Sequence, residues 1–502
     1  MGWFIARRLI VSFFVLLAST FLMYVLTALS GDPLADTREM TGPQREQRIA
    51  ELTERLNLET PVPLRYLMWL GGLFRGDLGL NREGQEVSTL LTQAMSSTLQ
   101  LVMLATVLAL FVGILIGIIS ALRQYSGFDY SVTFTAFIFF SLPAFVAATI
   151  LKQYVAIGFN NWLADPVIPP VVIAVVALFG GLVLGSLTVG DRLQRLTAFA
   201  IGAGATAAVL IYLSVTRWFA DPGLGLGLIL PVSLIVAFTL TVLLVGLRSK
   251  GPLIGAGVTA LIGSALYYPL FPLLNNPTWP LLIGLAVVTV AVGAGVGFLF
   301  GGLERRPAMR VSALVGLITA GMIFADHFLR AFYDYKELTF NRPIATVGSN
   351  TPNFSGSFWQ VTMDSATHLL LPTMALILIS LATYSRYSRS SMLEVMNQDY
   401  VRTARAKGLT ERAVVVRHAF RNGLIPITTL AAFDFGGIIG GAVITEDVFA
   451  WRGMGRLFFD GLDAVDPNPV MAFFIVTGGA IVVFNMIADI TYAYLDPRIR
   501  LS

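Results

Sequence analysis

The feature that most restricts the fold of this chain is a series of long apolar stretches that recur along almost its entire length. Each is about 20 residues long, which matches the thickness of the bilayer core when the stretch is helical. Because backbone polar groups in lipid must be satisfied within the segment, such stretches predict an all-α polytopic membrane protein. Twelve spans are expected, near residues 9–29, 98–122, 131–156, 168–188, 196–216, 225–247, 252–273, 280–302, 309–330, 364–385, 423–446 and 468–494.

The composition agrees with a membrane protein and excludes several kinds of site. Of the 502 residues, 56% are hydrophobic and only 13% are charged, well away from the balance of a soluble domain. The formal net charge of +4 is small and dispersed, so nucleic acid is not expected as a partner. The chain has no cysteine, which excludes disulfides, thiolate chemistry and cysteine-based metal sites.

The first apolar stretch has two interpretations. Arg7 and Arg8 precede residues 9–29, and Ala28-Leu29-Ser30 is similar to the small-residue cleavage site of a signal peptide. The stretch is longer than the apolar core of a signal peptide and has the length of a bilayer span. A retained first helix is therefore expected.

Loop charges predict the orientation of the spans. If the N-terminus is cytoplasmic, the inner loops hold most of the basic residues and the short outer loops are poor in them, as the positive-inside rule requires. The loop at 30–97 carries several arginines, but long loops are translocated largely regardless of charge. Both termini are therefore expected in the cytoplasm. Five tryptophans fall in or beside the predicted outer loops, namely Trp162, Trp218, Trp279, Trp359 and Trp451.

The long outer loop contains two further predicted elements. Apolar residues at positions 49, 52 and 56 recur at helical spacing, which predicts a short surface helix over residues 45–56. After Pro61 and Pro63, the stretch 66–70 is either a helix along the outer leaflet or a cap over the mouth of a pore.

Several separated motifs resemble the B-type permease subunit of dipeptide and oligopeptide ABC importers. The resemblance covers about residues 1–160 and 355–502. It implies a six-helix core of the type I importer kind, in a bacterial cytoplasmic membrane. The motifs that carry it are Arg7-Arg8-Leu9, Gly31-Asp32-Pro33, Gly76-Asp77-Leu78-Gly79, Ser141-Leu142-Pro143, His368-Leu369-Leu370-Leu371-Pro372, the run from Asp399 to Leu409, the run from Arg417 to Asn422, and Asp496-Pro497-Arg498-Ile499-Arg500.

The middle of the chain departs from this family. The family passes directly from its third to its fourth core helix, whereas this chain has about six additional spans there. The expected organisation is an N-terminal core part at 1–160, an inserted module at 161–350 and a C-terminal core part at 351–502. Small-residue pairs such as Gly293 with Gly297 predict close helix packing in the module. With few charges in its spans, it is expected to serve packing or partner binding.

The segment from about Ser388 to Asn422 is polar and basic, and it is expected to form two short helices broken at Gly408, the second capped by Thr410. By itself it could be an ordinary cytoplasmic loop. The resemblance implies a coupling element that docks on an ATPase subunit. Because Gly408 lies at the junction of the two short helices, a close helix junction is expected there. The residues expected to carry this role are Arg402, Thr403, Ala404, Arg405, Ala406, Lys407, Gly408, Glu411 and Arg412.

The resemblance also implies partners. They are a second homologous permease, two ATPase subunits, an extracytoplasmic peptide-binding protein and the peptide itself. The chain has no phosphate loop of the type G-x-x-x-x-G-K-[ST], so ATP and Mg²⁺ are expected in the ATPase subunits and no cofactor in this chain. Arg402-Thr403-Ala404 stands where other ABC permeases have Glu-Ala-Ala, which argues against a sugar or amino-acid permease.

A few polar residues lie at or near predicted spans. Asp434 is the strongest candidate for the transport pathway, with a structural carboxylate as the alternative. Ser141 and Pro143 are further pathway candidates. His368 is expected at a membrane interface, and the pair Asp326 and His327 at a solvated helix end.

Two other functional classes remain open. Twelve spans also suit a self-sufficient secondary transporter, although the halves are unlike and the 388–422 segment is unusual for that class. A membrane assembly or sensory protein dominated by the insertion is the third possibility. An enzyme is not expected, because neither H-E-x-x-H nor G-x-S-x-G occurs.

Overall fold

The computed structural model is an all-helical, multi-pass membrane protein. Among the residues that the structure describes, nine helices are long and apolar enough to cross a membrane, and the number is eleven if each of two bent helix pairs forms one span. These match eleven of the twelve predicted spans, while the twelfth, 423–446, lies partly outside the described residues. The structure describes residues 2–188, 190–246, 249–424, 426–428, 430–431, 434 and 442–495.

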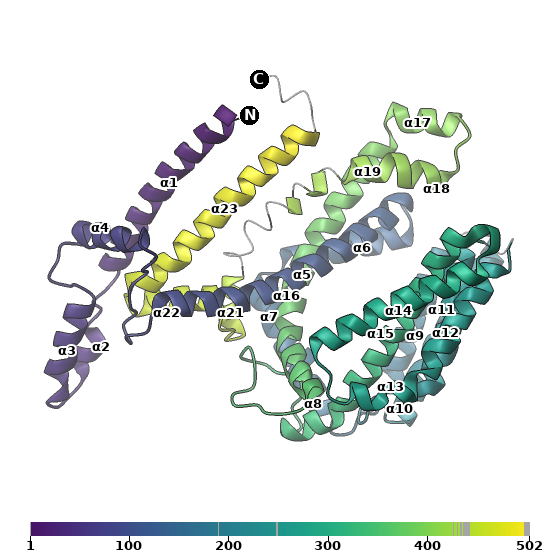
Figure 1. Ribbon diagram of the computed structural model, residues 1–502, viewed down its shortest axis with the longest axis horizontal. Coiled ribbons are helices and arrows are strands. Elements are labelled where there is room, and N and C mark those ends of the chain that lie inside the picture. Colours follow the sequence, from purple (N-terminus) through teal and green to yellow (C-terminus); the bar gives the residue numbers. More distant parts are fainter. Residues whose placement is uncertain are drawn as a thin grey trace. The chain divides into compact units, whose positions relative to one another are not determined.

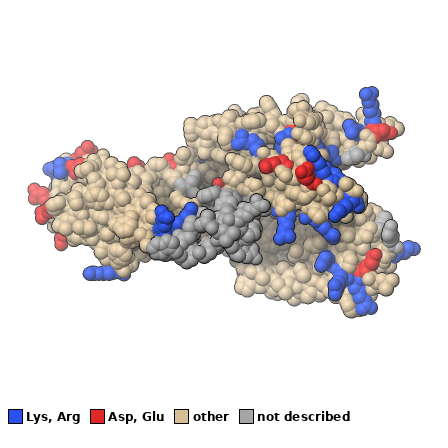
Figure 2. Space-filling view, turned by 90° about the horizontal axis from the view of Figure 1, so that it is seen from above, with Lys and Arg blue, Asp and Glu red and all other residues tan. Residues whose placement is uncertain are grey.

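The chain divides into two compact units. Unit 1 comprises residues 1–155, 346–349 and 369–502, and unit 2 comprises residues 156–345 and 350–368. On the face shown in Figure 2, most of the surface consists of residues other than Lys, Arg, Asp and Glu, as expected for a chain surrounded by lipid.

Unit 1 is built from both ends of the chain (Figure 1). Its first part holds α1 (Gly2–Leu29), α2 (Ala35–Glu39), α3 (Gln44–Arg55), α4 (Val62–Leu73), α5 (Val87–Leu122), α6 (Gly127–Ser141) and α7 (Ala144–Ile150). Its second part holds α17 (Asp399–Ala406), α18 (Glu411–Ala413), the π-helix η3 (Val414–Ala419), α19 (Phe420–Gly423), α21 (Val443–Val448), α22 (Met454–Asp463) and α23 (Pro467–Leu495). The π-helix η1 (Leu151–Ile157) and α16 (Phe358–Met396) pass between the units.

Unit 2 is a helical insertion. It contains α8 (Gly158–Trp162), α9 (Pro170–Leu187), α10 (Arg192–Val215), α11 (Gly225–Leu244), α12 (Gly251–Ala265), α13 (Tyr267–Leu274), α14 (Trp279–Phe300), the 3₁₀ turn η2 (Gly302–Glu304) and α15 (Arg305–Leu338). The predicted close packing of its glycines is confirmed. A Cβ on Gly293 would lie 2.7 Å from the Ser312 carbonyl oxygen, and one on Gly297 2.5 Å from that of Ala308, so α14 and α15 touch through their backbones.

The pair Asp326 and His327 corrects an expectation. It was predicted to be solvated, yet Asp326 is fully buried and His327 is only 5% exposed. Asp326 accepts hydrogen bonds from the backbone N–H groups of Leu224 and Gly225, the Tyr267 hydroxyl and Arg330. A buried carboxylate needs such partners to offset its desolvation. His368 is likewise buried, with Nδ1 2.8 Å from the Asp364 carbonyl oxygen.

The third predicted span is bent and not straight. α6 and the helix over residues 144–162 meet at 106°, because Pro143 has no N–H to donate and disfavours helical geometry at the residue before it. Leu142 is accordingly extended, with φ −81° and ψ 124°. After the bend, α7 packs against α21.

The predicted surface helix at 45–56 is confirmed as α3, with Leu52 and Leu56 buried. The stretch 66–70 lies within α4, which buries Tyr66 and Trp69 against Tyr24 of α1 and Met471 of α23. α1 and α23 themselves run side by side (Figure 1).

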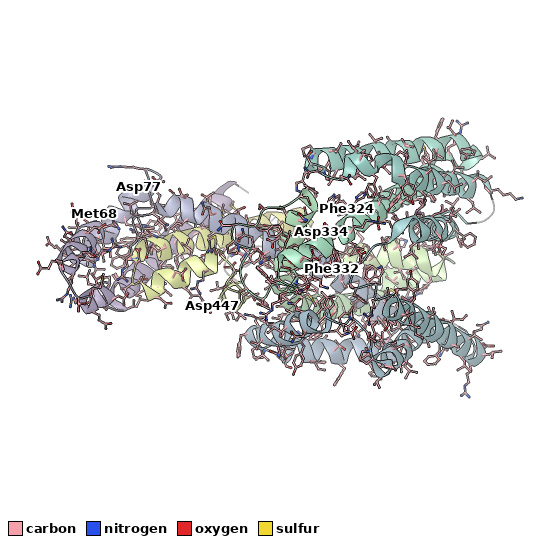
Figure 3. All side chains as sticks on the ribbon, turned by 90° about the horizontal axis from the view of Figure 1, so that it is seen from below. Met68, Asp77, Phe324, Phe332, Asp334 and Asp447 are labelled. Carbon is pink, nitrogen blue, oxygen red and sulfur yellow. The ribbon has the colours of Figure 1, made fainter. Side chains whose placement is uncertain are left out.

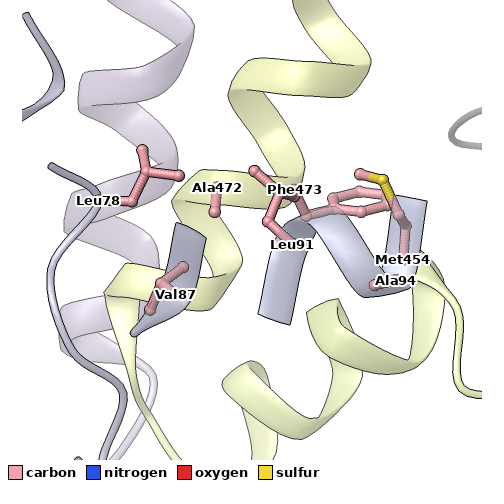
Figure 4. Packing of buried hydrophobic residues seen from close by; sticks show 7 residues of the cluster. All are labelled: Leu78, Val87, Leu91, Ala94, Met454, Ala472 and Phe473. Carbon is pink, nitrogen blue, oxygen red and sulfur yellow. The ribbon is translucent and has the colours of Figure 1, made fainter. Parts of the chain in front are cut away.

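A hydrophobic cluster anchors the long first loop of unit 1, residues 30–97, to the rest of the unit. α5 begins eleven residues before its predicted span, and its first turns supply Val87, Leu91 and Ala94 to this cluster. Figure 4 shows them packed with Leu78, Met454 of α22 and both Ala472 and Phe473 of α23. The long first loop is therefore held to the C-terminal helices by apolar burial.

Candidate functional site

The segment after α16 folds as a helical hairpin, here called the hairpin and comprising residues 399–423. Its first helix, α17, has Asp399 in the first turn and Arg405 in the last, both favourable with respect to the helix dipole. The helix ends in a Schellman motif. The N–H of Gly408 donates to the Arg405 carbonyl oxygen (2.9 Å) and the N–H of Leu409 to that of Ala404 (3.4 Å).

Gly408 breaks the two helices as predicted, but not for the expected reason. Its φ is +73°, in the left-handed region that favours glycine. A Cβ built on it would meet nothing within 4 Å. The expectation of a close helix junction at Gly408 is therefore wrong within this chain, and the glycine is required by backbone geometry.

The second helix of the hairpin starts as predicted at Thr410. The Thr410 hydroxyl accepts a hydrogen bond from the Ala413 N–H at 3.4 Å, which identifies Thr410 as the N-cap. The chain continues as the π-helix η3 and then as α19.

A small apolar core holds the two helices together. Val401, Ala404 and Val414 are buried and pack with Val395 and Met396 at the end of α16. Ala404 therefore faces the inside of the hairpin and is not available for direct contact with a partner.

An ion pair closes the hairpin across the break. Arg405 Nη2 lies 2.7 Å and Nε 3.2 Å from the two carboxylate oxygens of Glu411. The Arg405 guanidinium lowers the pKa of the Glu411 carboxyl. Both side chains are well exposed, at 40% and 59%, so the pair contributes at most about 1 kcal/mol. The structure thus pairs two predicted docking residues with each other.

The remaining predicted docking residues form an exposed surface. Arg402, Thr403, Ala406, Lys407 and Gly408 are all exposed. Leu409 and Tyr400, which were not predicted as docking residues, are 43% and 42% exposed beside them. The side chain of Arg412 lies outside the described part of the structure. Exposed basic side chains next to an exposed leucine and tyrosine are suited to binding another protein.

The hairpin is fixed to the membrane helices. The Ser391 hydroxyl donates to the Gly423 carbonyl oxygen at 2.8 Å. Met392 of α16 is buried with Ala121 at the end of α5 and Ala419 of η3. A displacement of the hairpin would therefore act directly on α5 and α16.

Two buried carboxylates of unit 1 were missed from the sequence. The Asp129 carboxylate, in a residue that is 2% exposed, accepts hydrogen bonds from Nε and Nη2 of Arg389 at 2.6 and 2.8 Å. It also accepts one from the Ser120 hydroxyl. Glu446, fully buried, accepts from the Thr98 hydroxyl at 2.6 Å and the Gly455 N–H at 2.7 Å. In the sequence, each of these residues is a carboxylate at the edge of an apolar run. Solvated carboxylates occur in the same pattern, so the sequence could not show that these two are buried.

The pathway candidates occupy two places. Ser141 and Pro143 are exposed at the bend between α6 and α7, where the Ser141 hydroxyl donates to the Ile138 carbonyl oxygen at 2.9 Å. Asp434 is exposed, and its carboxylate accepts a hydrogen bond from the hydroxyl of Tyr384 on α16. Residues 432–433 and 435–441 lie outside the described structure. A pathway role for these three residues stays a prediction.

Comparison with known proteins agrees with these features. Residues 311–501 match the family described as binding-protein-dependent transport system inner membrane component. The oligopeptide transport system permease protein OppB of Mycobacterium tuberculosis is 41% identical over 155 residues, which are 31% of this chain and 48% of the relative. In that match this chain spans about half the length of its relative.

Two further relatives extend the comparison. The oligopeptide transport system permease protein AppB of Bacillus subtilis is 27% identical over 505 residues, covering the whole of both chains. The dipeptide transport system permease protein DppB of Escherichia coli is 41% identical over 138 residues, 28% of this chain and 41% of the relative.

Proposed function

Because this chain belongs to the family of binding-protein-dependent transport system inner membrane components, we propose that it is the permease subunit of an ATP-driven peptide importer. It forms half of the translocation pathway, and the other half comes from a second, homologous permease. The observation that carries the proposal is the anchored hairpin at residues 399–423, in a chain whose relatives are named as peptide permeases.

The partners follow from the same reasoning. Two ATPase subunits bind ATP and Mg²⁺ and act on the permeases, and an extracytoplasmic binding protein delivers the peptide. The chain lies in the bacterial cytoplasmic membrane with both termini in the cytoplasm. This orientation places the exposed residues of the hairpin on the side where ATP is available.

The geometry of the hairpin suits the transmission of force. A flexible loop would absorb the motion of an ATPase, whereas the Schellman motif, the buried core around Val401 and the Arg405–Glu411 pair restrain this segment. Movement of the hairpin then reaches α16 through Ser391 and α5 through Ala121. Such rigid-body motion of helices can expose a central site to one side of the membrane at a time.

The test is uptake by the reconstituted complex. The chain is expressed with the second permease, ATPases and binding protein encoded beside it, and purified into proteoliposomes. A panel of labelled peptides of two to five residues is then offered with ATP, without ATP and with an imposed ion gradient. Uptake that needs ATP and the binding protein supports the proposal. Uptake driven by the ion gradient alone would overturn it in favour of a secondary transporter.

Reversing charges on the exposed surface of the hairpin tests, in the same assay, whether this surface binds the ATPase. Arg402→Glu combined with Lys407→Glu reverses two exposed charges of the hairpin without touching its core. This variant is expected to lose ATPase binding and peptide uptake. Arg456→Glu, in an exposed pair with Asp447 elsewhere in unit 1, is the matched control and should transport normally.

A further inference from the structure

A cavity with both polar and apolar lining residues lies at the end of unit 1 that contains α3 and α4. Its volume is about 320 Å³, and residues of α1, α3, α4 and the start of α23 line it. One face of α4 supplies Arg65, Met68, Trp69 and Gly72, which recur at helical spacing. Figure 3 labels Met68 and also Asp77, another lining residue, at this end of the unit.

Two side chains that line this cavity carry buried hydrogen-bond donors that have no acceptor among the described residues. They are Nε of Arg65 and Nε1 of Trp69, and the Trp69 side chain is only 7% exposed. Among the described residues, Arg65 donates one long hydrogen bond, from Nη1 to the Leu56 carbonyl oxygen at 3.4 Å. Unsatisfied buried donors cost free energy, so an acceptor group from outside the chain would be favoured here.

Two arginines, Arg55 and Arg65, line the cavity, and among the described residues Arg65 is the one that is not bound to a carboxylate. Arg55 is already bound to Glu51 and to the Arg82 carbonyl oxygen. Asp77, the carboxylate that lines the cavity, accepts a hydrogen bond from the Gly79 N–H at 2.8 Å. A guanidinium and an indole N–H together fit an oxyanion, because the planar guanidinium can present two parallel donors to carboxylate or phosphate oxygens.

The residues around the cavity indicate which kind of anion it would bind. Tyr24 lines the cavity five residues before the end of α1 at Leu29, about 7.5 Å along the helix axis, so the cavity lies near one end of a helix long enough to span the membrane. Beside the cavity, Leu64, Leu67 and Met68 of α4 are each more than 50% exposed. A cationic group next to exposed apolar side chains near the end of a span is typical of a segment bound at the membrane interface.

We propose that this cavity binds the phosphate of a phospholipid. The guanidinium of Arg65 and the indole N–H of Trp69 hold the phosphate oxygens, and the acyl chains lie against the exposed apolar side chains of α4. In the orientation proposed above, the lipid belongs to the outer leaflet. The binding itself does not depend on the transport function, so either proposal can fail without the other.

The probe is phosphatidylglycerol added to the full chain, purified in dodecyl maltoside and stripped of lipid. Native mass spectrometry counts bound lipid, and the melting temperature is followed during the titration. Arg65→Gln is expected to weaken lipid binding at least fivefold. The affinity of Arg65→Lys should lie between that of Arg65→Gln and that of the unaltered chain, because lysine keeps the charge but lacks the two parallel N–H donors of the guanidinium. Arg75→Gln removes an exposed arginine just after the same helix and should bind normally.

An alternative variant and two competing anions distinguish the possible outcomes. If Arg65→Gln does not fold, Trp69→Phe removes the indole N–H while keeping an aromatic ring, and weaker binding is again expected. Glycerol 3-phosphate and a tetraglutamate peptide, each in excess, should leave the lipid bound. Displacement by either would overturn the proposal in favour of a soluble anion or an acidic protein segment. Equal loss in Arg65→Gln and Arg75→Gln would overturn it as non-specific attraction.

Discussion

At Gly408, backbone conformation decides which residues the hairpin accepts. The residue has φ +73° and open space around it, so size is not the restriction. Burial also differs between acidic residues that are close in sequence. Asp466 is 1% exposed and Asp463, three residues earlier, is exposed, although nothing in the sequence distinguishes their environments.

Gly408→Ala is expected to loosen the hairpin. An L-residue in the left-handed region costs about 1 kcal/mol, and that cost falls on the Schellman motif that ends α17. Gly408→Asn should cost less, because asparagine tolerates this region better. The measurement is amide hydrogen exchange over residues 399–423, which should speed up in the order glycine, asparagine, alanine. Gly257→Ala, at an open site inside α12, is the control and should leave this exchange unchanged.

Asp466 predicts a pH dependence of stability. Its carboxylate accepts the N–H groups of Arg82 and Asn468, but burial outweighs them and raises its pKa to about 6. The folded state therefore binds a proton more tightly than the unfolded state. The resulting stabilisation is complete below the ordinary aspartate pKa and is lost as the pH rises through about 6. It amounts to roughly 3 kcal/mol.

The measurement is thermal unfolding at pH 4 and pH 7.5 in detergent. The unaltered chain should lose stability over this range relative to Asp466→Asn, which cannot titrate. Asp463→Asn, at the exposed end of α22, should behave like the unaltered chain at both pH values. A constant difference between the unaltered chain and Asp466→Asn would contradict the assignment.

At the scale of elements, α5, α6 and α16 form one packed group. α5 and α16 approach closely, since a Cβ on Gly117 would lie 2.6 Å from the Ser385 carbonyl oxygen. The Arg389–Asp129 pair joins α16 to α6, and the Ser120 hydroxyl brings in α5. The hairpin continues directly from this group, so its position depends on the pair.

Breaking the Arg389–Asp129 pair should cost stability. Arg389→Gln leaves a buried carboxylate uncompensated, and about 3 kcal/mol is expected from comparable buried pairs. Asp129→Asn should cost less, because Arg389 is 27% exposed and can turn to water. A double-mutant cycle on thermal stability should give a coupling energy of about 1–3 kcal/mol.

The control for this cycle is the exposed pair of Arg456 and Asp447, with side chains 43% and 50% exposed. Its coupling energy should stay below about 1 kcal/mol. Additive effects of Arg389→Gln and Asp129→Asn would show that the two helices are held by packing alone.

At the scale of the whole molecule, the absence of cysteine makes the topology directly measurable. Single cysteines are introduced at Ser249, Asn276 and Thr403 in intact cells and exposed to an impermeant thiol reagent. Asn276 should react from outside, whereas Ser249 and Thr403 should not. Ser249 and Asn276 flank the bent pair α12 and α13, so this comparison also tests whether that pair crosses the membrane. Labelling of Ser249 or Thr403 from outside would contradict the proposed orientation.

Several features followed from the sequence alone because each depends on short segments. The length of an apolar run determines whether a helix can span lipid, and this reasoning located eleven spans that the structure describes as helices. The N-cap at Thr410, the break at Gly408 and the surface helix at 45–56 depend on neighbouring residues only, and the structure has all three. The motifs of the family are equally local.

Only the tertiary structure decided what depends on contacts between distant segments. Asp326 was expected to be solvated, but it is buried because α11 and α13 supply its partners from about 100 and 60 residues away. The bend at Pro143 has a local cause, yet its angle depends on what α7 meets. Ala404 and Arg405 are both predicted as docking residues, and the fold turns the first inward and pairs the second with Glu411. A sequence lists the groups that can pair, whereas the packing of helices determines which of them meet and which remain free to bind something else.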